Sequence, residues 1–163
     1  MTAEPFRLLF VCTGNTCRSP LAEALARREA DARGWTHFAV ASAGVAAGAG
    51  DPASSGSVAA AEAVGLDLSG HRATLLTAEV AEDADLLLAM SPHHFFRAVE
   101  LGAGERSTLL TAFADGLEGE AAFDAPAIPD PFGASLDEYE RTRDHLEALV
   151  RKVMDRLEPV LAP

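Results

Sequence analysis

A cysteine and an arginine six positions apart, Cys12 and Arg18, have the types and spacing for covalent chemistry on an oxyanion. Cys12 directly follows the apolar run 8–11 and opens the segment Cys-Thr-Gly-Asn-Thr-Cys-Arg-Ser-Pro. Free backbone N–H groups at a helix start and the Arg18 guanidinium would converge on an anion held over the sulfur. The same positive field favours the thiolate, so one loop would both bind the anion and activate the nucleophile.

The other residues of this segment suit a tight strand-to-helix turn. Gly14 and Asn15 tolerate unusual backbone angles, Ser19 can cap a helix, and Pro20 suits a first helical turn. An ordinary turn with a buried cysteine is the alternative, but the agreement of strand, thiol, arginine and cap favours the anion loop. A nucleotide-binding loop of the Walker type fits less well, because the lysine that it needs is missing.

Asp130 is the candidate for proton transfer. A thiolate that attacks phosphorus needs a group that protonates the departing atom and later takes a proton from water. Asp130 lies between Pro129 and Pro131, which restrict the backbone and hold a carboxyl group at small entropic cost. A simple turn aspartate is the alternative interpretation.

Alternating patterns along the chain predict an α/β fold with a parallel sheet. Apolar runs of strand length lie at residues 8–11, 38–41, 86–90 and 108–110. Helices are predicted from Ser19 to Gly34, from Ser57 to Gly65 and from Ser91 to Gly102. A fourth helix starts at the capping box opened by Ser135. Its expected apolar stripe over the sheet consists of Leu136, Tyr139, Leu146, Leu149, Val150, Val153 and Leu157.

Two stretches without clear periodicity, residues 45–52 and 111–134, are predicted to be loops, the first of them flexible. The second is long for a compact domain, which suggests a functional role. Ligands of doubly wound sheets sit outside the carboxyl ends of the strands, where the Cys12 segment and both loops would emerge. We therefore expect Asp130 to meet Cys12 there.

Composition limits the classes of function. A length of 163 residues with 48% hydrophobic residues fits a single domain over residues 1–163. A net charge of −12 argues against nucleic acid or an anionic membrane as the main partner. With two cysteines, no leader pattern and no long apolar stretch, we expect a soluble cytoplasmic protein, a monomer or weak dimer.

The chain resembles the low-molecular-weight protein tyrosine phosphatases and their bacterial protein arginine phosphatase branch. The likeness rests on five blocks in family order: residues 12–20, Ser42-Ala-Gly44, Gly-His71-Arg-Ala, residues 85–90 and Asp130-Pro-Phe-Gly133. It implies a four-stranded parallel sheet with helices on both faces, Rossmann-like. It also implies a phosphorylated protein as substrate and inorganic phosphate as product.

The resemblance assigns roles to individual residues. Cys12 would be the nucleophile that forms a phosphocysteine, Arg18 the phosphate clamp, and Asp130 the general acid and then base. No metal or other cofactor is required, since Arg18 and the loop amides stabilise the transition state. The remaining phosphate- or substrate-binding residues would be Thr13, Gly14, Asn15, Thr16, Cys17 and Phe132. The supporting hydrogen-bond network would consist of Asn15, Ser19, Ser42 and His71.

Thr16 is the residue that best distinguishes between the two substrates, phosphoarginine and phosphotyrosine. Arginine phosphatases of the family resemble this chain in having threonine here, whereas tyrosine phosphatases tend to have a bulkier aliphatic residue. Phe132-Gly133 replaces the tyrosines usual after Asp-Pro. These two features favour phosphoarginine in proteins over phosphotyrosine. The loop 45–48 departs from this pattern, because it lacks the aromatic wall of many relatives and offers no ring for substrate stacking. An arsenate reductase would need more cysteines than two, and an inactive binding module would not need Cys12, Arg18 and Asp130 together.

Several remaining residues have a purely structural interpretation. Cys17 is either a small buried residue or a partner that traps oxidised Cys12 as a disulfide, and both readings stay open. Trp35 is expected to be a packing residue. The histidines without metal-ligand spacing are interpreted as structural, namely His37, His93, His94 and His145.

Overall fold

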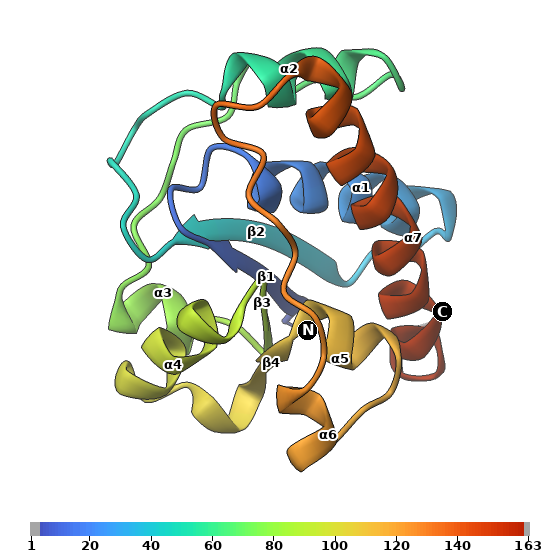
Figure 1. The fold of residues 1–163 in the computed structure, drawn as a ribbon. Helices are drawn as coiled ribbons and strands as arrows, with labels where there is room; N and C mark the ends of the chain where they lie inside the picture. The colour runs from blue at the N-terminus through green and yellow to red at the C-terminus, as the bar shows by residue number, and fades with distance from the viewer. Residues whose placement is uncertain (1–3, 162–163) are drawn as a thin grey trace.

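Helices cover both faces of a four-stranded parallel sheet in the computed structural model, which describes residues 4–161 (Figure 1). The strands are β1 (Phe6–Cys12), β2 (Phe38–Gly44), β3 (Leu86–Ala89) and β4 (Ser107–Leu109). Their order in the sheet is β2-β1-β3-β4, and every pairing is parallel. The predicted α/β class and all four predicted strands are confirmed, with bounds that shift by a few residues.

The strand order places a ligand site at the end of β1. β1 pairs with β2 on one side and with β3 on the other, so the chain reverses its direction of winding between β1 and β3. Such a switch point opens a crevice outside the carboxyl ends of these strands. Cys12 is the last residue of β1 and therefore lies at this crevice.

Side chains of β1 alternate between two hydrophobic cores. Leu8 and Phe10 point into the core beneath the longer helices, whereas Leu9 and Val11 point into the core on the opposite face. The helices α1 (Arg18–Ala32), α2 (Ser55–Glu62) and α7 (Leu136–Leu161) cover the first face, while α3 (Ala78–Glu82) and α4 (Pro92–Glu100) cover the second (Figure 1). The short helices α5 (Leu110–Ala114) and α6 (Glu120–Phe123) lie near β4, and a 3-10 turn (Gly104–Arg106) precedes it.

Two predicted helix caps are wrong. Cys17, not Ser19, is the capping position of α1, and the Ser19 hydroxyl contacts Cys12 instead. Ser54, not Ser57, caps α2, with its hydroxyl accepting from the Ser57 amide at 3.4 Å. In both cases a buried serine hydroxyl is used by the anion loop, since the Ser57 hydroxyl donates to the Cys17 carbonyl. Tertiary contacts thus compete with local capping.

The stretch 111–134 is not one uninterrupted loop. It contains the end of α5 and all of α6, and α3 was likewise not predicted. Helices of four or five residues show too few apolar repeats for periodicity to reveal them. A cap was nevertheless present for α3, because the Thr77 hydroxyl accepts from the Val80 amide at 3.2 Å.

The last helix forms as predicted, with one exception in its stripe. The Ser135 hydroxyl accepts from the Glu138 amide, as a capping residue does. Leu136 is exposed, so the buried stripe begins at Tyr139 and continues through Leu157. Trp35 is buried beside Phe38, which confirms its packing role.

Candidate active site

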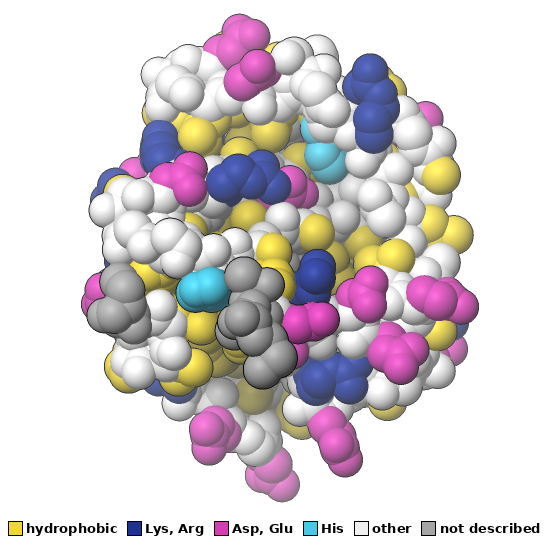
Figure 2. All heavy atoms as spheres, turned by 180° about the vertical axis from the view of Figure 1, so that it is seen from behind, with side chains coloured by type: hydrophobic (Ala, Val, Ile, Leu, Met, Phe, Trp, Pro, Cys, Tyr) yellow, Lys and Arg dark blue, Asp and Glu magenta, His cyan; other side chains and the backbone are white. Residues whose placement is uncertain are grey.

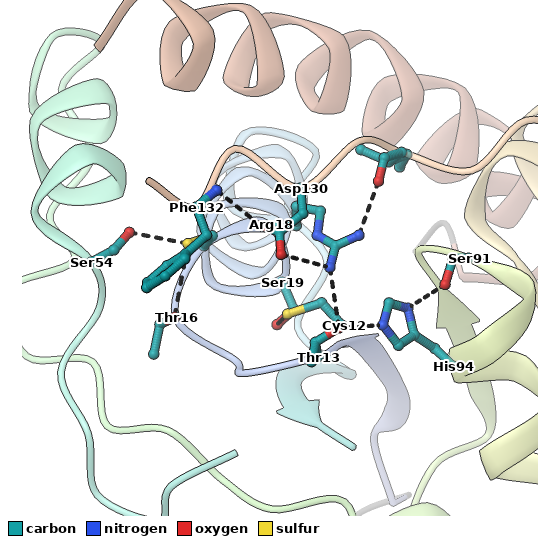
Figure 3. Close-up of polar contacts among 12 residues, drawn as sticks. Cys12, Thr13, Thr16, Arg18, Ser19, Ser54, Ser91, His94, Asp130 and Phe132 are labelled. Atoms are coloured by element: carbon teal, nitrogen blue, oxygen red, sulfur yellow. Dashed lines mark hydrogen bonds and ion pairs between the residues drawn. The ribbon is translucent and has the colours of Figure 1, made fainter. Parts of the chain in front are cut away.

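A small pocket joins the loop after β1 to the stretch that follows α6. Its volume is about 190 Å³. Figure 3 shows its side chains converging around Cys12. The lining residues are Cys12, Thr13, Gly14, Thr16, Cys17, Arg18, Asp130 and Phe132. The structure therefore brings the predicted nucleophile, clamp and acid to one place, as the sheet-edge argument required.

Asn15 lies behind the pocket as the centre of a hydrogen-bond network. It is fully buried with a φ of 56°, in the left-handed region that asparagine tolerates better than most residues. Its Oδ1 accepts from the Thr74 amide at 2.8 Å, and since an amide can only donate, this bond fixes the orientation of the side chain. Its Nδ2 then donates to the hydroxyls of Ser19 at 2.8 Å and Ser42 at 2.9 Å.

This network directs a hydroxyl proton at the sulfur. Ser19 Oγ accepts from Asn15, so its own proton remains available for Cys12 Sγ at 2.9 Å. A hydroxyl that donates to sulfur stabilises negative charge there. The network therefore directs one hydroxyl donor at the Cys12 sulfur.

A carboxylate that the sequence did not reveal completes the network. The Ser42 hydroxyl accepts from Asn15 and donates to Glu23 Oε1 at 2.6 Å. Glu23 is also paired with Arg27 at 2.7 Å. Glu23 lies on α1 beside the predicted loop, but nothing in its spacing pointed to Ser42.

His71 supports the same loop from another segment. Its Nε2 lies 2.7 Å from the carbonyl oxygen of Asn15. Because a carbonyl only accepts, Nε2 must carry the proton in this contact. Ser42 and His71 therefore both reach the loop, while their effect on catalysis stays a prediction.

Arg18 is buried and held on two sides. Nη1 donates to the Ile128 carbonyl at 2.9 Å, and Nη2 lies 3.4 Å from Thr13 Oγ1 and 3.6 Å from Asp130 Oδ2. Its Nε has no hydrogen-bond partner among residues 4–161. A guanidinium fixed in this way, with a donor to spare, suits two oxygens of a phosphate group.

Asp130 is placed by backbone contacts of its neighbours. The Ile128 amide donates to the Met90 carbonyl at the end of β3, at 2.9 Å. The Phe132 amide donates to Asp130 Oδ1 at 3.0 Å, which orients the carboxylate in a local turn. The flanking prolines thus act together with an anchor on the sheet that local sequence did not show.

The first part of the predicted flexible loop 45–52 is fixed. The amides of Val45 and Ala46 donate to the carbonyls of Cys12 and Thr13 at 3.0 and 2.9 Å. At Gly44 a Cβ atom would lie 2.4 Å from the Thr13 carbonyl oxygen, so only glycine fits. The end of the Ser42-Ala-Gly44 block therefore packs directly against the backbone of the anion loop.

His94, predicted to be merely structural, touches the anion loop. It is fully buried on α4, with Nε2 2.8 Å from Thr13 Oγ1 and Nδ1 3.0 Å from Ser91 Oγ. Burial, with smaller contributions from Arg18 and His93, lowers the pKa of His94 to about 4. No spacing in the sequence linked His94 to the loop, because α4 meets it only in the folded chain.

Cys17 faces the packing between α2 and α7. Its Sγ lies 3.3 Å from Ser54 Oγ and 3.6 Å from the Tyr139 hydroxyl. Burial raises the pKa of Tyr139, so this hydroxyl stays protonated at neutral pH. Both cysteines are free thiols, and the two interpretations of Cys17 stay open.

Thr16 and Phe132 form one side of the pocket (Figure 3). The carbonyl of Thr16 accepts from the Ser54 amide at 2.9 Å, which ties this side to the start of α2. Phe132 is 73% exposed, so its ring is available to a substrate. A substrate group that reaches Cys12 would therefore pass between a hydroxyl and an aromatic ring.

The surface carries mixed charge with acidic excess. Figure 2 shows acidic side chains over much of one face, with basic ones between them. Within residues 4–161 no group of three or more His, Cys, Asp or Glu side chains could hold a metal ion. No helix of that same part of the chain combines the length and the apolar character that crossing a membrane requires.

Comparisons with known proteins agree with this geometry. Residues 7–160 match the family model described as low molecular weight phosphotyrosine protein phosphatase. A protein-arginine-phosphatase of Bacillus subtilis is 39% identical over 92% of this chain and 95% of its own. The low molecular weight protein-tyrosine-phosphatase Etp of Escherichia coli is 34% identical over 92% of this chain and 93% of its own.

Solved structures give the same result. A cysteine-to-serine mutant of YwlE arginine phosphatase with a phosphorylated active site serine superposes with a TM-score of 0.84 and 37% identity. The match covers 94% of this chain and 96% of that one. This protein therefore belongs to the low molecular weight phosphotyrosine protein phosphatase family and is a cysteine-dependent phosphatase.

Proposed function

We propose that this protein removes the phosphate from phosphoarginine residues of proteins, with Cys12 as nucleophile, Arg18 as phosphate clamp and Asp130 as proton donor and acceptor. The observation that carries the proposal is that Thr16 and Phe132 line the same pocket as these three residues. Relatives named protein-arginine-phosphatase support it.

In the first step the Cys12 sulfur attacks phosphorus and the phosphorus–nitrogen bond breaks. Asp130 donates a proton to the departing guanidino nitrogen, so the arginine side chain leaves as its guanidinium and Asp130 is left as a carboxylate. Arg18 and the loop amides bind the phosphate oxygens as charge redistributes. The product on the protein is a phosphocysteine.

In the second step water attacks the phosphorus of the phosphocysteine. Asp130, now ionised, takes a proton from this water, and inorganic phosphate departs. The Ser19 hydroxyl donates to the sulfur as it regains its charge, so Cys12 leaves as a thiolate. The phosphorylated active site serine of the YwlE mutant supports a covalent intermediate at the corresponding residue.

Thr16 and the surface charge support phosphoarginine as the substrate. The Thr16 hydroxyl suits a polar, planar guanidinium near the leaving nitrogen, whereas an aliphatic wall would suit a phenyl ring. The Phe132 ring offers a face on which a guanidinium can stack. The net charge of −12 favours an arginine-rich target over an acidic one.

The test compares a phosphoarginine and a phosphotyrosine peptide of the same sequence. Wild type should hydrolyse phosphoarginine at least tenfold faster, and Thr16→Ile should reverse or erase that ratio. The exposed Thr36, outside the pocket, provides the control Thr36→Ile, which should keep the wild-type ratio. A preference for phosphotyrosine that Thr16→Ile leaves unchanged would instead assign the protein to the tyrosine branch.

Covalent catalysis has its own test. Cys12→Ser should retain phosphate binding and lose turnover, and turnover that survives this change would contradict covalent catalysis by Cys12. A wild type that binds phosphate without any turnover would instead be a binding module. An arsenate reductase is disfavoured because Cys12 and Cys17 are the only thiols, too few for the relay of that enzyme class.

The assembly and location belong to the same proposal. We propose a monomer or weak dimer as the active form, because Cys12, Arg18 and Asp130 of a single chain already meet in the pocket. Two free thiols, one of them the nucleophile, support a reducing compartment such as the cytoplasm. Inorganic phosphate is the second product.

A further inference from the structure

Thr13 connects the phosphate clamp to a buried histidine on the other face of the sheet. Thr13 Oγ1 lies 3.4 Å from Arg18 Nη2 and 2.8 Å from His94 Nε2. His94 continues to Ser91 Oγ at 3.0 Å, at the capping position of α4 (Figure 3). The chain of contacts Arg18, Thr13, His94, Ser91 thus joins the site to α4.

The chemistry of arginine sets the direction of the first hydrogen bond in this chain of contacts. A guanidinium can only donate, so Thr13 Oγ1 accepts from Arg18. The histidine contacts depend on the neutral tautomer: either Nε2 accepts from the Thr13 hydroxyl and Nδ1–H donates to Ser91 Oγ, or Nε2–H donates to Thr13 Oγ1 and Nδ1 accepts from the Ser91 hydroxyl. In both tautomers Thr13 Oγ1 keeps a lone pair for Arg18.

Three properties fit a neutral histidine at this position. The side chain is only 1% exposed, the Arg18 guanidinium is its charged neighbour, and burial lowers the pKa of His94 to about 4. A protonated His94 would direct a second donor at Thr13 and repel Arg18. The neutral ring avoids this repulsion and keeps its single hydrogen bond with Thr13.

We propose that His94 is a positioning residue for the phosphate site, which acts through Thr13 to hold the Arg18 guanidinium in its phosphate-binding orientation. The inference rests on the proposed role of Arg18 as the clamp. A merely structural His94 would stabilise α4 equally well without any effect on phosphate affinity. The two cases therefore differ in what a change at Nε2 does.

Two substitutions separate the ring nitrogens. In His94→Gln the side-chain amide can reach the place of Nε2, and in His94→Asn it can reach the place of Nδ1. The Gln variant should bind inorganic phosphate within about threefold of wild type by calorimetry. The Asn variant should bind it about tenfold more weakly and lose a similar factor in kcat/KM, because one hydrogen bond in the chain to a charged group is missing.

A double-mutant cycle tests the route through Thr13. Thr13→Val removes the hydroxyl and keeps the shape, and it should weaken phosphate binding by a similar factor. In the double variant with His94→Asn the losses should not add, since both remove the same contact. His145→Gln is the matched control, because His145 is exposed on α7 and lies outside the pocket.

Equal phosphate affinity in His94→Asn and wild type, or additive losses in the double variant, would overturn the proposal. The proposal would also be overturned if His94→Asn and His94→Gln lost the same phosphate affinity, in proportion to their drop in melting temperature. The binding measurement needs no turnover. A wild type that binds phosphate but hydrolyses no phosphoarginine would therefore count against the proposed function only. The role of His94 would still be decided by the phosphate affinities of the variants.

Discussion

The Cys12 loop and the Asp130 loop meet in one pocket but are built in opposite ways. Asn15, Arg18 and Ser19 are buried, and their side-chain bonds fix the first loop. In the second loop the side chain of Asp130 is 46% exposed and Phe132 is 73% exposed, and Asp130 is held only by the Phe132 amide and by the ion pair with Arg18 at 3.6 Å. The difference indicates that the anion site is preorganised, whereas proton transfer and substrate contact use an accessible surface.

The largest expected effect is on the exposed side. Asp130→Asn should lower kcat about 10²- to 10⁴-fold, because the leaving nitrogen loses its proton donor. The melting temperature and phosphate affinity should change little, since Arg18 keeps its bond to the Ile128 carbonyl. Asp124→Asn, an exposed neighbour in the same stretch, should leave all three measurements unchanged. A mere turn aspartate at position 130 would leave kcat near the wild-type value.

The buried side should respond in stability as well as in rate. Asn15→Ala would remove partners from the hydroxyls of Ser19 and Ser42 and from the Thr74 amide. We expect a loss of about 2–4 kcal/mol in the free energy of unfolding, measured in urea, together with a loss of activity. An unfolding free energy within about 0.5 kcal/mol of wild type would show that the loop does not depend on this network.

Acid should weaken the buried side through His94. Its pKa of about 4 lies below the value of 6.5 for an unfolded chain, so the unfolded state binds the proton more tightly. The stabilising contribution of neutral His94 is fully present above pH 6.5 and is lost as pH falls to about 4. From the linkage relation we expect a loss of about 3 kcal/mol between pH 7 and pH 4.

Unfolding of His94→Gln and wild type at several pH values isolates this contribution. The unfolding free energy of wild type should fall relative to that of His94→Gln as pH falls, because only wild type loses the contribution of neutral His94. The charged and titratable groups near His94 are Arg18, His93 and Asp130, so His93→Gln serves as a second background. A difference that is constant with pH would mean that His94 titrates normally.

The smallest expected effect is at the outer wall of the pocket. Phe132→Ala should raise KM for a phosphoarginine peptide roughly tenfold, because a stacking surface is lost. The free energy of unfolding should stay within about 0.5 kcal/mol, since the ring is exposed. A strong loss of stability would contradict the contrast between the two loops.

Much of the fold followed from local sequence. The runs at residues 8–11 and 86–90 are buried on both faces and appear as strands, and the Ser135 box begins the last helix. The short helices α3, α5 and α6 were missed because one turn of helix carries almost no periodic signal. Leu136 was wrongly predicted to be buried, because an amphipathic pattern does not show where along its length a helix stops packing against the rest of the protein.

The caps of α1 and α2 failed for a different reason. Ser19 and Ser57 are good local capping residues, yet their hydroxyls are used by Cys12 Sγ and by the Cys17 carbonyl. A cap contributes about 1 kcal/mol, and a buried group without a partner costs more. Local preference therefore yields where the loop needs the same hydroxyl.

By itself, the sequence determined the order of strand, thiol, arginine and helix, because strand and helix periods and the spacing from Cys12 to Arg18 are local properties. Only the tertiary structure decided which distant groups complete the site: Glu23 behind Ser42, the Ile128 carbonyl on Arg18, and His94 on Thr13. These contacts satisfy buried donors and acceptors across separate elements. Such pairings depend on packing in three dimensions, which no local pattern records.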